Sequence, residues 1–410
     1  MDGSPPPDAR AFAIRLATFY GALFVVYGMN VPYMPVWLDW RGLTAPEISA
    51  VMAAPFFLRI LITPAVALIA DRNGSHRVML IVLAWLSLGL VLALSQAATF
   101  WPIMLLTVPL IICNSTIMPL TETVAVAGVR RAGLDYGRMR LWGSLSFVAA
   151  SFVGGVAVAH YGGGAGVWLV AFGCLVTVVA AHNLPRDTAD SAEPVGNGDK
   201  AVPLWRASEP GLLLRQPAFI AFLLAAGLIQ AAHATFLTFG ALIWQKQGLG
   251  GAWIGALWAI GVIAEVVVFA MSGALVERFG TVRLLLAGAG ASVVRWIAMG
   301  FDPDLTVLVP LQLLHGITYG ASHVAAIHFI KQAVPRHASG TAQALYATVA
   351  AGLAMGIATL IAGWIFSDYG SASYFSMAAV SVLAFLAAVR LLRIWNGAEL
   401  YAVAPGVQLT

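Results

Sequence analysis

Charged residues are scarce in this sequence. Only 10% of its 410 residues are Asp, Glu, Lys or Arg, whereas 60% are hydrophobic. Soluble globular domains carry about 25% charged residues, so a chain of this length in water would have too few charges to cover its surface. The composition therefore excludes a soluble globular protein and predicts an integral membrane protein.

Cysteine is also rare, and the usual signatures of enzymes and ATP-driven pumps are missing. Cys113 and Cys174 lie in apolar runs without metal-ligand spacing, so neither a disulfide framework nor a zinc site is expected. The sequence contains no GxxxxGK[ST] loop for a nucleotide and no nucleophile–base cluster. The basic residues are dispersed between apolar segments, which argues against nucleic-acid binding. We therefore expect no enzymatic activity, no cofactor and no metal.

Long apolar runs fill most of the chain. A helix needs about 20 apolar residues to cross a bilayer, and twelve runs meet this requirement. They are Ala11–Leu38, Ala45–Ala70, Val78–Gln96, Trp101–Val126, Arg140–His160, Ala165–Leu184, Ala218–Trp244, Ala252–Val276, Val282–Gly300, Leu305–Ile330, Gly340–Phe366 and Ala372–Leu392. The first six and the last six are separated by the only long hydrophilic stretch of the sequence.

Lysine and arginine orient these helices. Eighteen of the 22 lie on one side of the predicted membrane: Arg10, Arg15, Arg72, Arg77, Arg130, Arg131, Arg138, Arg140, Arg186, Lys200, Arg206, Arg215, Arg278, Arg283, Lys331, Arg336, Arg390 and Arg393. Only Arg41 and Lys246 lie on the other side, and Arg59 and Arg295 lie within helices. Because cytoplasmic loops are rich in Lys and Arg, both termini are predicted to be cytoplasmic. The N-terminal "MDGSPPPDAR" has no basic region typical of a cleaved signal peptide.

The two halves of the chain resemble each other. At an offset of 206 residues, the segment from Leu43 to Leu80 aligns without a gap with the segment from Leu249 to Leu286, and "ADRNGSHR" matches "VERFGTVR". Duplicated six-helix halves with a substrate site near the midplane are typical of major facilitator transporters. We predict an all-α membrane protein with twelve transmembrane helices in two pseudo-symmetric six-helix bundles. The bundles are residues 1–184 and 216–393, with a cytoplasmic linker at 185–215 and a tail at 394–410.

The repeated loops resemble the acidic-Arg-x-Gly-x-x-Arg loop of the major facilitator superfamily. "PLTETVAVAGVRRAGLDYGRMRLWGS" is similar to the segment between helices four and five of the lactose permease and related proton symporters, and helix ten is similar to the phenylpropionate porter branch. The loop resemblance implies a breakable cytoplasmic gate of ion pairs, which we assign to Asp71, Arg72, Glu277 and Arg278.

Ionisable residues inside the predicted helices are the candidates for function, because charges in a membrane usually face a cavity and have partners. The resemblance places Glu122 and Arg140 at the substrate, although a pair that only clamps two helices is the alternative. Tyr27, Phe147, His233 and Arg59 are further candidates for substrate contact. A phenylalanine at position 147, where the lactose permease has a tryptophan, favours an aromatic acid over a sugar.

Glu265, His315, His323 and Arg295 are the candidates for proton coupling. The lactose permease has a carboxylate one turn after its equivalent of His315, but here that position is Thr318. This difference favours Glu265 as the proton carrier, with a histidine as relay. Glu265 aligns with Arg59 in the repeat, so a structural bond between them is an alternative. At 100° per residue, His323 is expected about 80° around the helix from His315.

These observations predict a monomeric, proton-coupled symporter of a small organic anion such as an aromatic carboxylate, in a bacterial inner membrane. Its partners would be the substrate, protons and lipid. A sugar or nucleoside symporter, or a multidrug efflux antiporter, is the alternative. A receptor without transport activity is less consistent with duplicated loops and buried charges in both halves.

Overall fold

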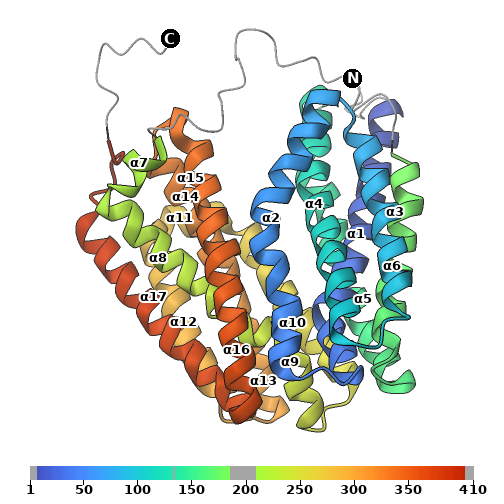
Figure 1. Ribbon diagram of the computed structural model, residues 1–410. Coiled ribbons are helices and arrows are strands. Elements are labelled where there is room, and N and C mark those ends of the chain that lie inside the picture. The colour runs from blue at the N-terminus through green and yellow to red at the C-terminus, as the bar shows by residue number, and fades with distance from the viewer. Residues whose placement is uncertain (1–6, 133, 185–208, 402–410) are drawn as a thin grey trace. The chain divides into compact units, whose positions relative to one another are not determined.

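A computed structural model describes residues 7–132, 134–184 and 209–401, and all regular structure in these residues is helical (Figure 1). The first six predicted spans correspond in order to six helices. They are α1 (Pro7–Trp40), α2 (Ala45–Asn73), α3 (His76–Leu94), α4 (Phe100–Ala132), α5 (Tyr136–Tyr161) and α6 (Ala165–His182). The predicted linker lies outside the described residues from 185 to 208, as does the predicted tail from 402 onwards.

Helix boundaries follow local capping chemistry. At the start of α2 the Glu47 carboxylate accepts a hydrogen bond from the backbone N–H of Thr44 at 2.8 Å, which satisfies a donor that has no partner within the helix. At its end Gly74 adopts the left-handed conformation with φ 58°, which glycine takes without steric cost. The repeated loop motif therefore ends one helix and begins the next.

The second half of the chain is more interrupted than the sequence predicts. Its elements are α7 (Glu209–Leu214), α8 (Pro217–Ala231), α9 (Ala234–Lys246), α10 (Gly251–Ala270), α11 (Ser272–Phe279), α12 (Thr281–Met299), α13 (Leu305–Leu313), the π-helix η1 (Gly316–Ala321), α14 (Ser322–Ala333), the 3₁₀-helix η2 (Arg336–Ala338), α15 (Ser339–Tyr346), the π-helix η3 (Ala347–Ala354), α16 (Met355–Tyr369), the 3₁₀-helix η4 (Gly370–Ser373) and α17 (Tyr374–Ile394). Predicted helices seven, eight, ten and eleven are thus each divided into shorter elements.

The helices have the lengths that a membrane requires. Within the described residues, ten stretches are long and apolar enough to span a bilayer, and the last one, Arg336–Ile394, holds 59 residues and contains predicted helices eleven and twelve. Predicted helix ten is not among these ten. Large apolar side chains such as Leu61, Trp101 and Trp364 are more than two-thirds exposed, as expected for surfaces in contact with lipid.

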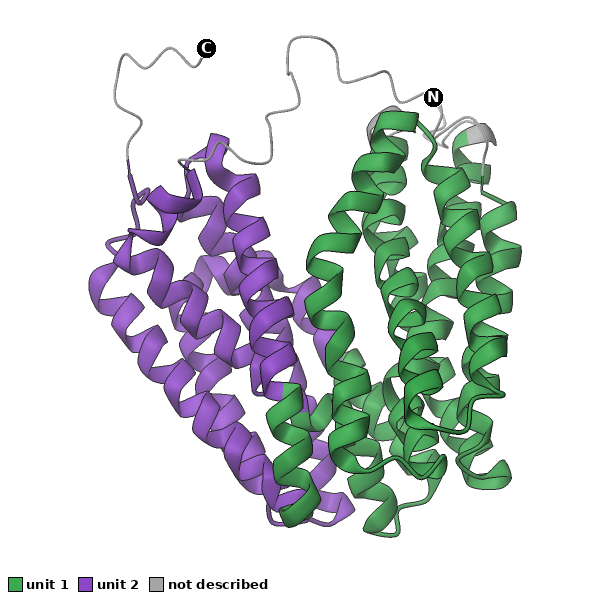
Figure 2. Cartoon of the chain, viewed as in Figure 1, with its two compact units in different colours: residues 1–196, 235–263, 359–370 green, residues 197–234, 264–358, 371–410 purple. Residues whose placement is uncertain are grey.

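The chain forms two compact units (Figure 2). Unit 1 comprises residues 1–196, 235–263 and 359–370, and unit 2 comprises residues 197–234, 264–358 and 371–410. Helices α10 and α16 therefore contribute residues to both units. The division at 184 and 216 that the sequence suggests stays a prediction.

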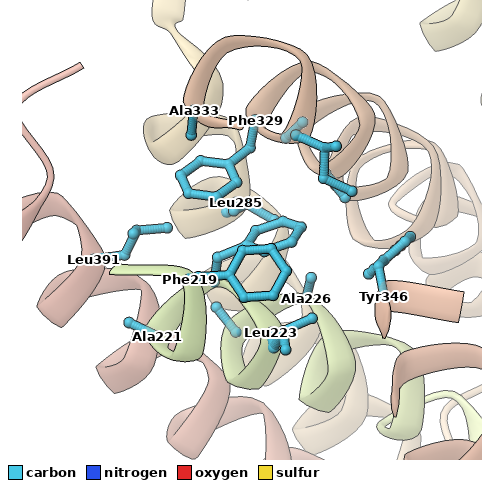
Figure 3. Packing of buried hydrophobic residues seen from close by; sticks show 14 of the residues in the cluster. Phe219, Ala221, Leu223, Ala226, Leu285, Phe329, Ala333, Tyr346 and Leu391 are labelled. Carbon is cyan, nitrogen blue, oxygen red and sulfur yellow. The ribbon is translucent and has the colours of Figure 1, made fainter. Parts of the chain in front are cut away.

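Each unit has its own packing. In unit 1, α1 packs along α5 and α6, and α5 closely approaches α10, because a Cβ atom at Gly155 would lie only 2.1 Å from the carbonyl oxygen of Gly251. In unit 2, buried apolar side chains of α8, α12, α14 and α17 form a cluster (Figure 3). The rings of Phe222 and Phe329 stack at its centre with centroids 4.3 Å apart.

Candidate functional site

The first group of candidate residues lies in unit 1, where α4 and α5 bring a carboxylate near a guanidinium. Helix α5 begins after Asp135, whose carboxylate accepts a hydrogen bond from the backbone N–H of Arg138 at 3.1 Å. Tyr136 and Arg140 therefore stand one turn apart on the same face of α5. Glu122 lies on α4, and its carboxylate is in reach of both Tyr136 and Arg140 of α5.

The contacts of this carboxylate are unequal. Tyr136 Oη donates a hydrogen bond to Glu122 Oε2 at 2.5 Å. Arg140 Nε is 3.7 Å from Glu122 Oε1, a distance at which the charges attract each other but that is too long for a hydrogen bond. The side chains of Glu122 and Arg140 are 29% and 28% exposed, so both remain accessible. The predicted pair is thus present, and Tyr136 is a member that the sequence analysis missed.

Aromatic rings of α1 support the guanidinium. Arg140 Cζ lies 4.2 Å from the ring centroid of Phe24 and 5.6 Å from that of Tyr20, within the range of cation–π contacts. Gly143 leaves room for this arrangement, since a Cβ atom there would lie 2.9 Å from Phe24 Cδ2 and 3.2 Å from Arg140 Nη1. We call Glu122, Tyr136, Arg140, Phe24 and Tyr20 the Arg140 site.

The other predicted substrate residues of unit 1 have separate contacts. The ring of Tyr27 meets Phe24 edge-on with centroids 5.2 Å apart, and its hydroxyl donates to the carbonyl oxygen of Asn114 at 2.8 Å. Tyr27 therefore extends the aromatic face of the Arg140 site. Phe147 is buried where α5 packs against α1. The guanidinium of Arg59 lies over the ring of Phe56 at 4.7 Å.

The second group of candidate residues lies in unit 2, around the fully buried Arg295 of α12. Its Nη2 donates to Gln312 Oε1 at 2.8 Å, and its Nη1 lies 3.0 Å from His315 Nδ1 and 3.2 Å from Thr318 Oγ1. The hydroxyl of Thr318 lies in turn 3.2 Å from Nε2 of His233. We call these five residues, together with Glu265, the Arg295 network.

The hydrogen-bond partners assign the proton of each histidine. His233 Nδ1 lies 2.8 Å from the carbonyl oxygen of Ile229, which can only accept, so Nδ1 carries a proton, and Nε2 lies 3.2 Å from the Thr318 hydroxyl. A guanidinium can only donate, so Nδ1 of His315 accepts from Arg295 and the proton of this ring is on Nε2. The His315 imidazole is therefore neutral.

In this tautomer the Nε2–H group of His315 is on the side of the ring nearest the Glu265 carboxylate. His315 Nε2 is 3.7 Å from Glu265 Oε2, beyond hydrogen-bond distance. Helix α10 comes this close to η1 because Gly316 lacks a side chain: a Cβ atom there would be 2.7 Å from the carbonyl oxygen of Ala264. The structure thus brings Glu265, His315, Arg295 and His233 together within unit 2, and the sequence analysis had missed Gln312.

The position of His323 corrects the sequence expectation. The Tyr319 ring stacks on that of His315 with centroids 5.3 Å apart. The His323 ring is in turn nearly parallel to that of Tyr319, with centroids 6.3 Å apart. The three rings form one column rather than lying about 80° apart. The reason is the π-helix η1, which turns less per residue than an α-helix and moves His323 onto the face of His315.

The predicted gate residues lie at the ends of helices. Asp71 Oδ1 is 2.8 Å from Nε2 of His76, so this carboxylate contacts a histidine of its own loop. Arg72, Glu277 and Arg278 are exposed, and the guanidinium of Arg278 lies over the neighbouring ring of Phe279 at 5.4 Å. Their function as a gate stays a prediction.

Comparison with known proteins defines the class of this chain. The sequence profile of the MFS_1 like family matches residues 13–377, so the chain belongs to this family. It is a secondary transporter of the major facilitator type and not an enzyme, which confirms the class that the sequence predicts.

Two relatives and one solved structure extend this result. The chain is 32% identical over 375 residues to a probable 3-phenylpropionic acid transporter of Escherichia coli (strain K12), covering 90% of this chain and 94% of that protein. It is 29% identical to a maltose permease of Geobacillus stearothermophilus, covering 85% and 86% of the two chains. The crystal structure of the nucleoside transporter NupG superposes with a TM-score of 0.80 at 16% identity, covering 94% and 100% of the chains. The last similarity supports the fold alone.

Proposed function

We propose that this transporter carries a small aromatic carboxylate together with protons, by alternating access of its two halves. The main support is the arrangement of Arg140, whose guanidinium lies 4.2 Å from the Phe24 ring without a close hydrogen bond to Glu122. Arginine binds carboxylates through two parallel N–H···O bonds, and the adjacent rings suit an aromatic body. The relative named as a probable 3-phenylpropionic acid transporter is consistent with such a substrate.

Proton coupling would use the Arg295 network. Glu265 has a side chain that is 20% exposed, whereas that of His315 is 10% exposed, so the carboxylate is the more accessible member. A protonated Glu265 can donate to Nε2 of His315 only when that nitrogen is unprotonated. The relay therefore requires the imidazole to release Arg295 and take the tautomer with its proton on Nδ1, and the gap of 3.7 Å to shorten to hydrogen-bond distance. We assign Glu265 as the proton carrier, His315 as its relay and Arg295 as the cation that orients His315. We keep His323 as a further candidate relay, since its ring lies parallel to that of Tyr319, which stacks on His315.

The transporter would lie in a bacterial inner membrane as a monomer, with both termini in the cytoplasm. Asp71, Arg72, Glu277 and Arg278 would form the cytoplasmic gate. This orientation rests on the distribution of lysine and arginine between the loops.

The decisive experiment measures uptake of labelled 3-phenylpropionate into vesicles that contain the purified protein, with an imposed pH gradient. We expect accumulation, and we expect Arg140→Gln to abolish it because the carboxylate loses its cationic partner. Arg138→Gln is the matched control, since this side chain is 88% exposed and pairs with Asp135, which does not belong to the Arg140 site. Full substrate affinity in Arg140→Gln would contradict the proposal.

The competing function is symport of a sugar or nucleoside. The relative named as a maltose permease favours this candidate. The same vesicles distinguish the two, because accumulation of maltose or uridine without accumulation of 3-phenylpropionate would replace the proposed substrate. Gradient-driven expulsion of an amphiphile would instead indicate an efflux antiporter.

A further inference from the structure

Two donors of α5 compete for the same carboxylate in the Arg140 site. Tyr136 Oη donates to Glu122 at 2.5 Å, whereas Arg140 Nε remains 3.7 Å away. Arginine–carboxylate pairs in direct contact are frequently bidentate, with N···O distances of about 2.7–2.9 Å. Glu122 therefore makes its strong bond to the hydroxyl and not to the guanidinium, although the guanidinium carries the opposite charge.

The surroundings of Arg140 explain how the guanidinium stays in this position. It lies 4.2 Å from the Phe24 ring, and the missing side chain of Gly143 leaves space for both groups. Tyr136 stands one turn earlier on α5 and draws the carboxylate towards its hydroxyl. Tyr136 itself is 37% exposed, and Glu122 and Arg140 are accessible to a similar degree, so a dissolved anion can reach the guanidinium.

We propose that the Tyr136 hydroxyl is a positioning group that holds Glu122 away from Arg140 and so keeps the guanidinium available for the carboxylate of the substrate. This inference rests on the proposed function, since it assigns the determinant of anion affinity in that same site. Without the hydroxyl, Glu122 becomes an internal competitor, because its carboxylate can take the bidentate position that the substrate needs. Tyr136 then acts through Glu122 and does not itself bind the anion.

The proposal predicts that the effect of Tyr136 depends on Glu122. The purified full-length protein is titrated with 3-phenylpropionate, and the dissociation constant is measured for wild type, Tyr136→Phe, Glu122→Gln and the double variant. We expect Tyr136→Phe to weaken binding about tenfold, as estimated for one charge-assisted hydrogen bond. We expect the same change to have no effect in the Glu122→Gln background, because a neutral amide does not form the competing ion pair. Such non-additivity identifies an interaction between the two positions.

The controls separate the alternatives. Tyr161→Phe alters a tyrosine at the opposite end of α5 that is 75% exposed, and it should bind as wild type does. If wild type binds 3-phenylpropionate and Tyr136→Phe binds equally well, the positioning role is refuted while the proposed function stands. If Tyr136→Phe weakens binding to the same degree in the Glu122→Gln background, Tyr136 contacts the substrate directly and the positioning role is again refuted. If wild type does not bind the acid, the proposed function fails and this inference fails with it.

Discussion

Replacing Thr318 by valine tests the hydrogen bonds of the Arg295 network. The Thr318 hydroxyl is fully buried, lies 3.2 Å from Arg295 Nη1 and lies 3.2 Å from His233 Nε2. Valine keeps the shape of the side chain but removes both bonds. A hydrogen bond to a charged group is worth about 1.5–3 kcal/mol and a neutral one about 0.5–1.5 kcal/mol. We therefore expect Thr318→Val to lower the free energy of unfolding by about 2–4 kcal/mol.

The same chain provides a matched control. Thr235 is also fully buried, but its hydroxyl has no hydrogen-bond partner among the described residues. Thr235→Val removes an unsatisfied polar group, so it should leave stability unchanged or raise it slightly. Thr318→Ser keeps the hydroxyl and should lose less stability than Thr318→Val.

Thermal unfolding of the purified variants, followed by circular dichroism, measures these differences. At about 2–4 °C per kcal/mol, Thr318→Val should unfold roughly 4–16 °C below wild type. Equal melting temperatures for Thr318→Val and wild type would refute the hydrogen-bonded network. A loss in Thr235→Val as large as that in Thr318→Val would show that shape, and not hydrogen bonding, determines stability at both positions.

Two further predictions concern transport. Gly143→Ala should raise the KM for the aromatic acid about tenfold, because its Cβ would lie 2.9 Å from Phe24 and displace the ring that supports Arg140. Gly89→Ala, where a Cβ meets nothing within 4 Å, is the control and should transport as wild type does. Equal kinetics of the two variants would contradict this reasoning. Glu265→Gln should abolish uptake driven by a pH gradient but preserve exchange of labelled for unlabelled acid, and unchanged gradient-driven uptake would remove Glu265 as the proton carrier.

Much of the fold follows from the sequence because a bilayer imposes simple rules. Apolar runs of about 20 residues must be helical, since backbone groups in lipid need internal hydrogen bonds. The boundaries of α2 and α6 therefore fall close to the predicted ones. The gapless repeat between the two halves of the sequence indicates the superfamily. The interruptions of predicted helices seven, eight, ten and eleven follow no such rule. No proline or glycine marks the break at His233, where the ring binds the carbonyl oxygen of Ile229.

The candidate sites show the same contrast. The spacing of Glu122 and Arg140 was sufficient to predict the pair, because the segment resembles a known one and both residues are charges in an apolar context. Tyr136 was overlooked because a tyrosine near a membrane boundary is an ordinary interfacial residue. Its position four residues before Arg140 was the available signal. The column of His315, Tyr319 and His323 depends on a π-helix, and a calculation at 100° per residue could not predict it.

Proton-coupled uptake of an aromatic carboxylate is tested most directly by following external pH when 3-phenylpropionate is added to vesicles that contain the protein. The medium is weakly buffered and held near neutral pH, well above the pKa of an ordinary carboxyl group at about 4–5, so that little neutral acid crosses the lipid unaided. Protein-free vesicles and vesicles with Glu265→Gln correct for that passive entry. We predict that the external medium becomes more alkaline as labelled acid enters, and only with the wild-type protein. Entry of the acid without any change in external pH beyond that of the controls would contradict proton coupling, and the absence of entry would contradict the substrate.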